Sequence, residues 1–108
     1  PSAILFQEPE LFMAAQQFLI KRGLRIPEDV SLFCVDYSPL FDWSEPLASH
    51  SRWDHEKIIE HIVDWAKKAS TGETEIQREL LDAEFIEGAT IGPVPSGGEG
   101  EATKGKVW

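Results

Sequence analysis

Residues 3–35 read AILFQEPELFMAAQQFLIKRGLRIPEDVSLFCV and place two short apolar runs on either side of a helical pattern. The runs Ala3–Phe6 and Val30–Val35 do not alternate with polar residues, which is typical of strands buried on both faces. Between them, apolar residues recur at helical spacing from Pro9 to Arg22, and Gly23 follows as a C-terminal cap. The stretch therefore predicts a strand–helix–strand unit with parallel strands and a right-handed crossover.

The rest of the chain predicts a second helix and further strands. Asp54 is a suitable N-cap for a helix that extends to about Ser70, with apolar residues along one face. The short runs predicted as strands are Leu47–His50, Ile76–Leu81 and Glu84–Glu87. We therefore expect an α/β fold over residues 1–95, with a mostly parallel, βαβ-based sheet flanked by helices. Residues 96–108 are rich in Gly, Glu and Lys, and we expect a flexible tail.

The composition excludes several classes of function. The chain has 108 residues, of which 42% are apolar, and this is enough for one core. Its formal net charge of −9 speaks against a nucleic-acid-binding module and against docking on an anionic membrane. The single cysteine, Cys34, excludes an internal disulfide and a cysteine-rich metal site. No apolar run is long enough for a membrane span and no signal peptide is visible, so we expect a cytoplasmic protein.

Polar and aromatic side chains are expected to gather at one edge of the sheet. In open parallel sheets, ligands bind beyond the carboxyl ends of the strands. Glu8 follows the first strand, Asp36 closes the second, and Arg52 and Trp53 follow the third. A carboxylate and a guanidinium form directional hydrogen bonds with hydroxyl groups, and an indole stacks on a sugar ring or a base. We interpret these four residues as a candidate binding site for a polar small molecule.

Each of the four residues also has a purely structural interpretation. Asp36 is a suitable turn residue, and Glu8 is a suitable helix cap. Arg52 would pair with Asp36 or Asp54, and Trp53 would pack against its neighbours. The sequence contains no P-loop, dinucleotide fingerprint, nucleophile elbow or pair of metal ligands. It therefore predicts no catalytic residue, no metal and no cofactor.

The order of these motifs resembles the LacI/GalR family of bacterial transcription regulators. Residues 23–31 read GLRIPEDVS, where family members typically have Gly-Leu-Arg-Val-Pro-Glu-Asp-Val-Ser. Residues 1–4 read PSAI where the family has Pro-Thr-Ala-Ile, and residues 91–93 read IGP where it has Thr-Gly-Pro. The resemblance covers about residues 1–95 and corresponds to the C-terminal part of the effector-binding domain.

The resemblance implies a type I periplasmic-binding-protein-like fold and a regulator rather than an enzyme. Such a protein senses a small-molecule effector, with a sugar as the expected class, and acts allosterically. Operator DNA would be bound only through an N-terminal helix-turn-helix that this sequence does not contain. Asp36 corresponds to the family's sugar-binding Asp, Glu8 to its ligand-facing Asn and Arg52 to its Gln. The last two are departures in residue type, so the cleft differs more from the family than the scaffold does.

The resemblance also implies a homodimer. The helix Pro9–Arg22 carries a wide apolar band, which includes Phe12, Met13, Ala15, Gln16 and Leu19. Exposed apolar surface of this kind marks a partner site, and a two-fold pair is the commonest solution. We expect this band to line the dimer interface; the structural alternative is that it packs on other parts of the same lobe.

Two other functions compete with the regulator. A solute-binding transport protein of the same fold would carry an export signal upstream of Pro1. A response-regulator-like enzyme that accepts a phosphoryl group on Asp36 would need a second acidic pair and a lysine at a strand end. Lys57, Lys67 and Lys68 all lie on the predicted second helix, which disfavours the enzyme.

Overall fold

The computed structural model describes residues 2–73 and 78–95, and these form two compact units. The sheet unit contains the described residues up to Arg52 and from Phe85 onward. The helix unit contains the described residues of Trp53–Glu84. The predicted flexible tail, residues 96–108, lies outside the described residues.

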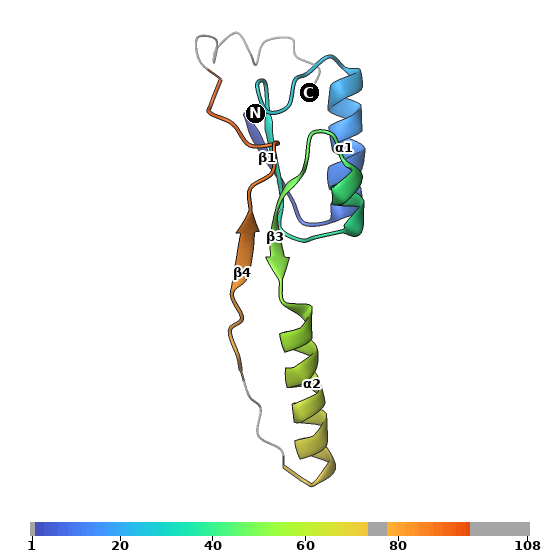
Figure 1. Cartoon of the computed structure of the whole chain (residues 1–108), viewed down its shortest axis with the longest axis vertical. Helices are drawn as coiled ribbons and strands as arrows, with labels where there is room; N and C mark the ends of the chain where they lie inside the picture. The colour runs from blue at the N-terminus through green and yellow to red at the C-terminus, as the bar shows by residue number, and fades with distance from the viewer. Residues whose placement is uncertain (1, 74–77, 96–108) are drawn as a thin grey trace. The chain divides into compact units, whose positions relative to one another are not determined.

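The sheet unit begins with the predicted strand–helix–strand motif (Figure 1). β1 (Ala3–Phe6) leads into α1 (Pro9–Lys21), and β2 (Ser31–Cys34) lies parallel to β1. Pro9 occupies the first position of α1, where its missing N–H leaves no partner unsatisfied. Gly23 has a φ of +83°, in the left-handed region that a residue without Cβ adopts at low cost. These two local signals start and stop the helix, and the predicted motif is confirmed.

The third strand is shifted from its predicted position. The sheet has the order β1-β2-β3-β4, and β3 (Ser49–Trp53) lies parallel to β2. The sequence predicts this strand at Leu47–His50, but Ser49 is the first of its residues to align with β2, opposite Phe33. The α/β class and the mostly parallel sheet are confirmed. The start of β3 is set by its pairing with β2 and not by the apolar residues at its predicted start.

The last predicted strands have different outcomes. β4 (Ala83–Ile86) overlaps the predicted strand Glu84–Glu87. The prediction for Ile76–Leu81 is wrong over residues 78–81, which form no strand, and Leu80 there is fully exposed. Residues 76 and 77 lie outside the described part of the chain.

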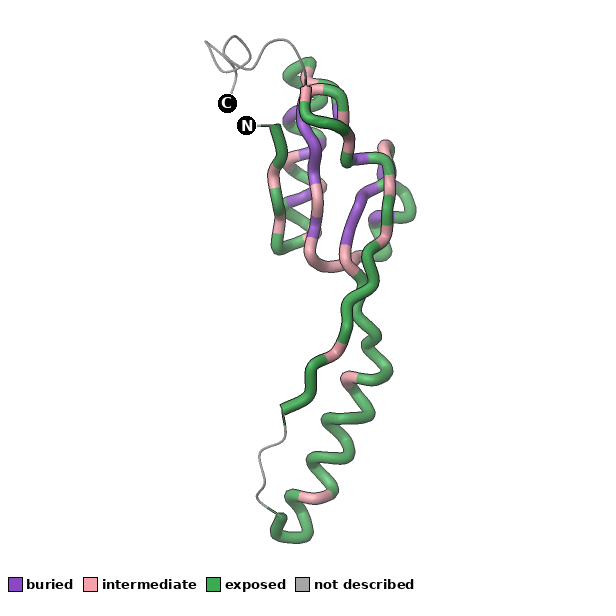
Figure 2. Tube along the Cα trace, turned by 90° about the vertical axis from the view of Figure 1, so that its left-hand side faces the viewer, coloured by how far each residue is buried: buried purple, intermediate pink, exposed green. Residues whose placement is uncertain are grey.

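The core of the sheet unit lies between α1 and the strands. Phe12 and Leu19 of α1 pack against residues of β2 and of the loops on either side of it. The buried apolar residues are Phe12, Leu19, Ile26, Val30, Leu32, Cys34, Phe41 and Ala48. Figure 2 shows the buried positions gathered in this unit. Burial of a large apolar side chain contributes about 1.5–3 kcal/mol, so this cluster is the main source of stability.

A segment from the end of the described chain, residues 88–92, bonds to both central strands; we call it the return segment. Thr90 is fully buried, and its hydroxyl donates to the carbonyl of Leu32 over 2.7 Å. The same hydroxyl accepts from the N–H of Ser49 over 2.9 Å. The N–H of Leu32 in turn donates to the Thr90 carbonyl over 2.8 Å. The return segment therefore satisfies polar groups of β2 and β3 that would otherwise be buried without partners.

The main element of the helix unit is α2 (His55–Ser70). Asp54 accepts from the N–H of Lys57 over 3.2 Å, which confirms the predicted cap. Within the described structure, α2 has no buried residue, although it is amphipathic. The large exposed apolar residues on this helix are Ile59, Ile62, Val63 and Trp65.

Candidate functional site

Glu8 lies where the predicted site begins, between β1 and α1. It is the N-cap residue of α1, with an extended backbone, and its carbonyl accepts from the N–H of Phe12 over 3.1 Å. Its exposed carboxylate makes no capping hydrogen bond, unlike the carboxylate of Asp54 at α2. The capping interpretation therefore holds for the position of Glu8 but not for its side chain.

Asp36 lies just beyond the carboxyl end of β2. Its side chain is half-buried, and its Oδ1 accepts from the N–H of Tyr37 over 2.8 Å. This bond fixes the carboxylate in a turn and leaves lone pairs on both oxygens for another donor. Asp36 is thus a turn residue, as its structural interpretation predicts, and its carboxylate can still accept further hydrogen bonds.

Arg52 lies near the carboxyl end of β3 and stacks on Tyr37. Its guanidinium carbon is 3.9 Å from the centroid of the Tyr37 ring, a cation–π contact. Among the described residues, no carboxylate forms an ion pair with Arg52, so its predicted pairing with Asp36 or Asp54 is wrong. The aromatic ring holds the guanidinium in place of a carboxylate.

The Tyr37 ring packs against His50 and Phe41, two residues that the sequence analysis did not assign to the site. Its ring centroid lies 5.2 Å from that of His50 and 6.3 Å from that of Phe41, which belongs to the short 3₁₀ helix η1 (Pro39–Trp43). Its hydroxyl is 3.4 Å from a carboxylate oxygen of Asp42. The side chains of His50 and Phe41 are 5% and 2% exposed, so the Tyr37 ring packs against buried residues of the core.

The orientation of His50 follows from its hydrogen bond. Its Nδ1 lies 2.9 Å from the carbonyl oxygen of Ala48, and since a carbonyl only accepts, we assign the proton to Nδ1. The ring is thereby fixed between Tyr37 and Phe41, whose centroids lie 5.2 Å and 5.3 Å away. The structure thus brings Asp36, Tyr37, His50 and Arg52 together at the carboxyl ends of β2 and β3. The aromatic composition of residues 37–46 was the signal in the sequence, but it did not identify the contacts.

Trp53 is the last residue of β3 and is described with the helix unit. Its side chain is 41% exposed. Its role in ligand binding stays a prediction.

The band predicted for the dimer interface is largely internal. Phe12, Gln16 and Leu19 are buried in the core of their own chain, and Met13 and Ala15 are half-buried. The Nε2 of Gln16 donates to the carbonyl of Pro46 over 3.1 Å, whereas its buried Oε1 has no hydrogen-bond partner among the described residues. Assigning these three buried residues to a dimer interface was therefore wrong. The exposed apolar residues of α1 are Leu11, Phe18 and Ile20.

Cys34 lies at the end of β2 and is buried in the core of the sheet unit. Burial raises the pKa of the Cys34 thiol, which fits its expected role as a core residue. Within residues 2–73 and 78–95, no group of three potential metal ligands comes together. None of the helices in that part is long and apolar enough to cross a membrane.

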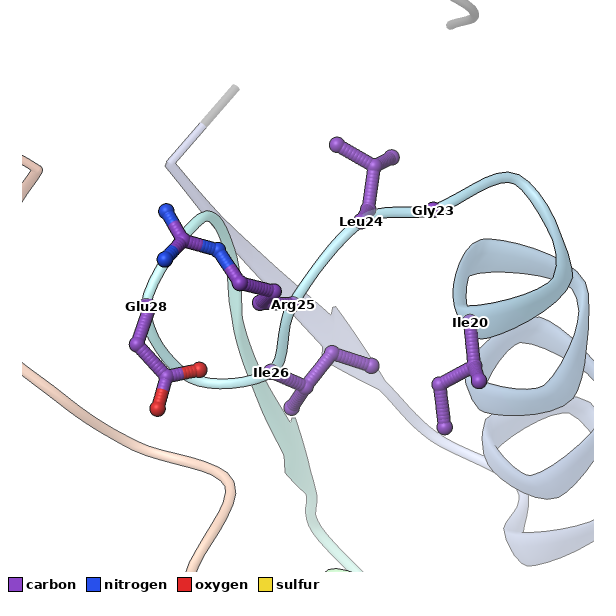
Figure 3. Close-up of a pocket in the computed structure, with 6 residues that line it drawn as sticks. All are labelled: Ile20, Gly23, Leu24, Arg25, Ile26 and Glu28. Atoms are coloured by element: carbon purple, nitrogen blue, oxygen red, sulfur yellow. The ribbon is translucent and has the colours of Figure 1, made fainter.

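A hollow of about 580 Å³ lies at the opposite end of the sheet unit, where α1 ends and the chain leads into β2. Ile20 of α1 and Ile26 of the loop face one another across it (Figure 3). The guanidinium of Arg25, which also lines it, is already paired with Asp29 by contacts of 3.0 and 3.1 Å. The hollow is lined by apolar side chains and by Glu28, its guanidinium is already paired, and none of the predicted site residues lines it.

Comparison with known proteins places this fold. Residues 1–91 match the family of the periplasmic binding protein-like domain. No curated protein matches the chain. Among solved structures, a LacI family transcriptional regulator from Bifidobacterium animalis is similar, with a TM-score of 0.79 and 22% identity over 87% of this chain. The transcription regulator CcpA of Lactococcus lactis has a TM-score of 0.75 and 15% identity over 84%.

A third similar structure is the lac repressor dimer bound to operator and the anti-inducer ONPF, with a TM-score of 0.75 and 21% identity over 84% of this chain. The chain covers only 32–35% of the length of these three regulators. At this level of identity the structures establish the fold, and the sequence match establishes the family. The chain therefore belongs to the periplasmic binding protein-like domain family and has the fold found in LacI-type transcriptional regulators.

Proposed function

We propose that the chain is the C-terminal part of the effector-binding domain of a LacI-type transcriptional regulator. The protein would act in the cytoplasm, sense a small molecule with a sugar as the expected class, and regulate transcription allosterically. The observation that carries the proposal is the position of Asp36 and Arg52 at the carboxyl edge of a parallel sheet, each held by Tyr37. This edge is where open α/β sheets bind ligands. No step of bond making or breaking is assigned to these residues.

The test of effector binding is calorimetric titration of the full-length protein with hexoses and pentoses. A charged hydrogen bond contributes about 1.5–3 kcal/mol, so Asp36→Asn is expected to weaken binding about 10- to 100-fold. Asp82→Asn is the matched control, because Asp82 is exposed and belongs to the helix unit. If Asp36→Asn is folded and binds as tightly as wild type, Asp36 is a turn residue only.

We further propose that the full-length protein is a homodimer that binds operator DNA through its N-terminal part. The net charge of −9 supports assigning DNA binding to a part outside this chain. On α1, the exposed Leu11, Phe18 and Ile20 are the residues that a partner would cover. Sedimentation of wild type and Leu11→Glu at high protein concentration tests the dimer. A monomeric wild type, or a mobility shift of operator DNA by the isolated chain, would contradict this assignment.

A solute-binding transport protein remains the alternative, because the matched family is defined by a periplasmic binding protein-like domain. The two functions differ in what precedes Pro1. An export signal in the native gene would favour transport, and a helix-turn-helix would favour regulation.

A further inference from the structure

Arg52 differs from Arg22, which also stacks on a ring, because within residues 2–73 and 78–95 the Tyr37 ring is its only side-chain partner. Arg22 lies 4.8 Å from the centroid of Phe18, and it caps the C-terminus of α1, where a cation is stabilised by the helix dipole. Arg52 has a closer ring contact, 3.9 Å, at the end of a strand, where no such dipole acts. The position of Arg22 is explained by its helix, whereas that of Arg52 is not explained by its strand.

The stacking leaves the hydrogen-bond donors of Arg52 available. A guanidinium has five N–H donors in a planar fork, and none of them takes part in an ion pair within the described residues. With its carbon 3.9 Å from the ring centroid, the guanidinium lies over the face of Tyr37, and the ring accepts none of its N–H groups as a carboxylate would. Such a fork matches the two oxygens of a carboxylate or a phosphate.

The ring beneath the fork is held by the core, so the fork is oriented before any ligand arrives. Tyr37 contacts the rings of His50 and Phe41, both of which are buried. The His50 ring is itself fixed through Nδ1 to the Ala48 carbonyl. An oriented side chain loses less conformational entropy on binding than a free surface arginine does.

Asp36 supplies the complementary group on the backbone side of Tyr37. Its Oδ1 accepts the Tyr37 N–H, and its remaining lone pairs suit the hydroxyl groups of a ligand. Tyr37 thus contacts both groups: its N–H holds the Asp36 carboxylate, which is an acceptor, and its ring holds the Arg52 guanidinium, which is a donor. A neutral sugar can accept from the fork through hydroxyl groups, but only an oxyanion also neutralises its charge and matches it with two oxygens.

We propose that this edge binds an anionic sugar, with the oxyanion on Arg52 and hydroxyl groups on Asp36. The oxyanion is a carboxylate or a phosphate, since both present two or more oxygens to the fork. The inference rests on the proposed function, because it names the class of effector that the same site takes. It assigns to Arg52 the selection of charged over neutral sugars.

The experiment compares matched ligands on the full-length protein by calorimetry. The probes are glucose, glucuronate and glucose 6-phosphate, the same three forms of galactose, and inorganic phosphate. An anionic form is expected to bind at least about 10-fold more tightly than its neutral parent. Glucuronate or galacturonate binding alone indicates a carboxylate ligand, and the 6-phosphates alone indicate a phosphate ligand.

Two variants of Arg52 and one control variant test whether Arg52 causes the preference for an anionic ligand. Arg52→Gln is expected to abolish the preference for the anion, weakening anion binding about 10- to 100-fold, and Arg52→Lys is expected to restore part of it. Arg22→Gln is the control, because it removes the other stacked arginine and should leave affinity unchanged. Equal melting temperatures of the unliganded variants show that folding is preserved.

Failure of this inference and failure of the proposed function give different results. If neutral sugars bind as well as anionic ones and Arg52→Gln changes neither, the protein senses sugars but Arg52 selects no anion. If no sugar binds, sugar sensing is wrong, and the inorganic phosphate titration decides on the oxyanion subsite. Phosphate binding that is lost in Arg52→Gln supports the subsite; its absence in wild type overturns it.

Discussion

The sheet unit and the helix unit contain helices of similar length that are stabilised differently. α1, with 13 residues, buries Phe12, Gln16 and Leu19 against its own unit. α2, with 16 residues, buries none among the described residues, although it has a well-formed cap and lysines in its last turn. Isolated helices of this length are marginal in water, because most helical stability in proteins comes from packing. The capping and helix-forming residues of α2 therefore determine where the helix lies in the sequence, but they do not supply the packing that stabilises α1.

The largest expected loss of stability follows from truncating a buried side chain of α1. Phe12→Ala should cost about 3–5 kcal/mol of unfolding free energy, because Phe12 is fully buried and contacts the rings of Phe6 and Phe41. Ile62→Ala on α2 should change it by less than about 0.5 kcal/mol in this chain, because Ile62 is exposed. Urea unfolding followed by circular dichroism measures both. Equal costs would mean that α2 is packed as α1 is.

A smaller effect is expected for the hydroxyl of Thr90. Thr90→Val removes the partner of the Leu32 carbonyl and of the Ser49 N–H, and each buried group left unpaired costs about 1–3 kcal/mol. Thr71→Val is the matched control, because the Thr71 hydroxyl donates to the carbonyl of Lys68 at an exposed position. Thermal unfolding of both variants checks the difference. A Thr90→Val protein as stable as wild type would show that the two hydrogen bonds of the Thr90 hydroxyl are not needed for the stability of the sheet.

The cap of α2 gives an effect confined to the helix unit. Asp54→Ala should destabilise α2 by about 1 kcal/mol, because it removes the acceptor of the Lys57 N–H. Amide hydrogen exchange should therefore accelerate along α2 and stay unchanged along α1. Asp54→Asn keeps a capping oxygen and should retain most of the protection. Faster exchange in both helices would show that the two units unfold together.

The smallest expected effect is the pH dependence from Cys34. Burial raises the pKa of this thiol in the folded state, so its contribution to stability is full below its unfolded pKa of about 8.5 and is lost as pH rises through the folded value. The unfolding free energy should therefore fall more steeply at alkaline pH in wild type than in Cys34→Ala. An identical slope in both proteins would exclude titration of Cys34 as a contribution.

Local signals explain why much of the fold could be predicted. Pro9, Gly23 and Asp54 act within a few residues, so the bounds of α1 and α2 followed from the sequence. The start of β3 did not, because it depends on pairing of Ser49 with β2. The need for glycine at position 88 could not be predicted either, because a Cβ there would clash with the backbone carbonyl of Leu47, a residue distant in sequence.

The candidate site was predictable in part, for the same reason. Strand order placed Asp36 and Arg52 at one edge, but the stacking of Arg52 on the Tyr37 ring is a tertiary contact that strand order does not predict. Gln16 was expected in the apolar band of the dimer interface, and its hydrogen bond to the distant Pro46 carbonyl could not be predicted from the local sequence. Residues whose role depends on a partner far along the chain cannot be identified from local pattern.

The return segment has a consequence for the order of events during synthesis. Leu32 leaves the ribosome long before Thr90, which is 58 positions later and supplies its hydrogen bonds. Until then, polar groups of β2 and β3 have only water or passing chains as partners, and such edges are prone to mispairing. Every residue of the helix unit must be translated before the sheet can close. The bonds of Thr90 to Leu32 and Ser49 therefore form only after the helix unit has been synthesised, so completion of the native sheet has to wait for translation.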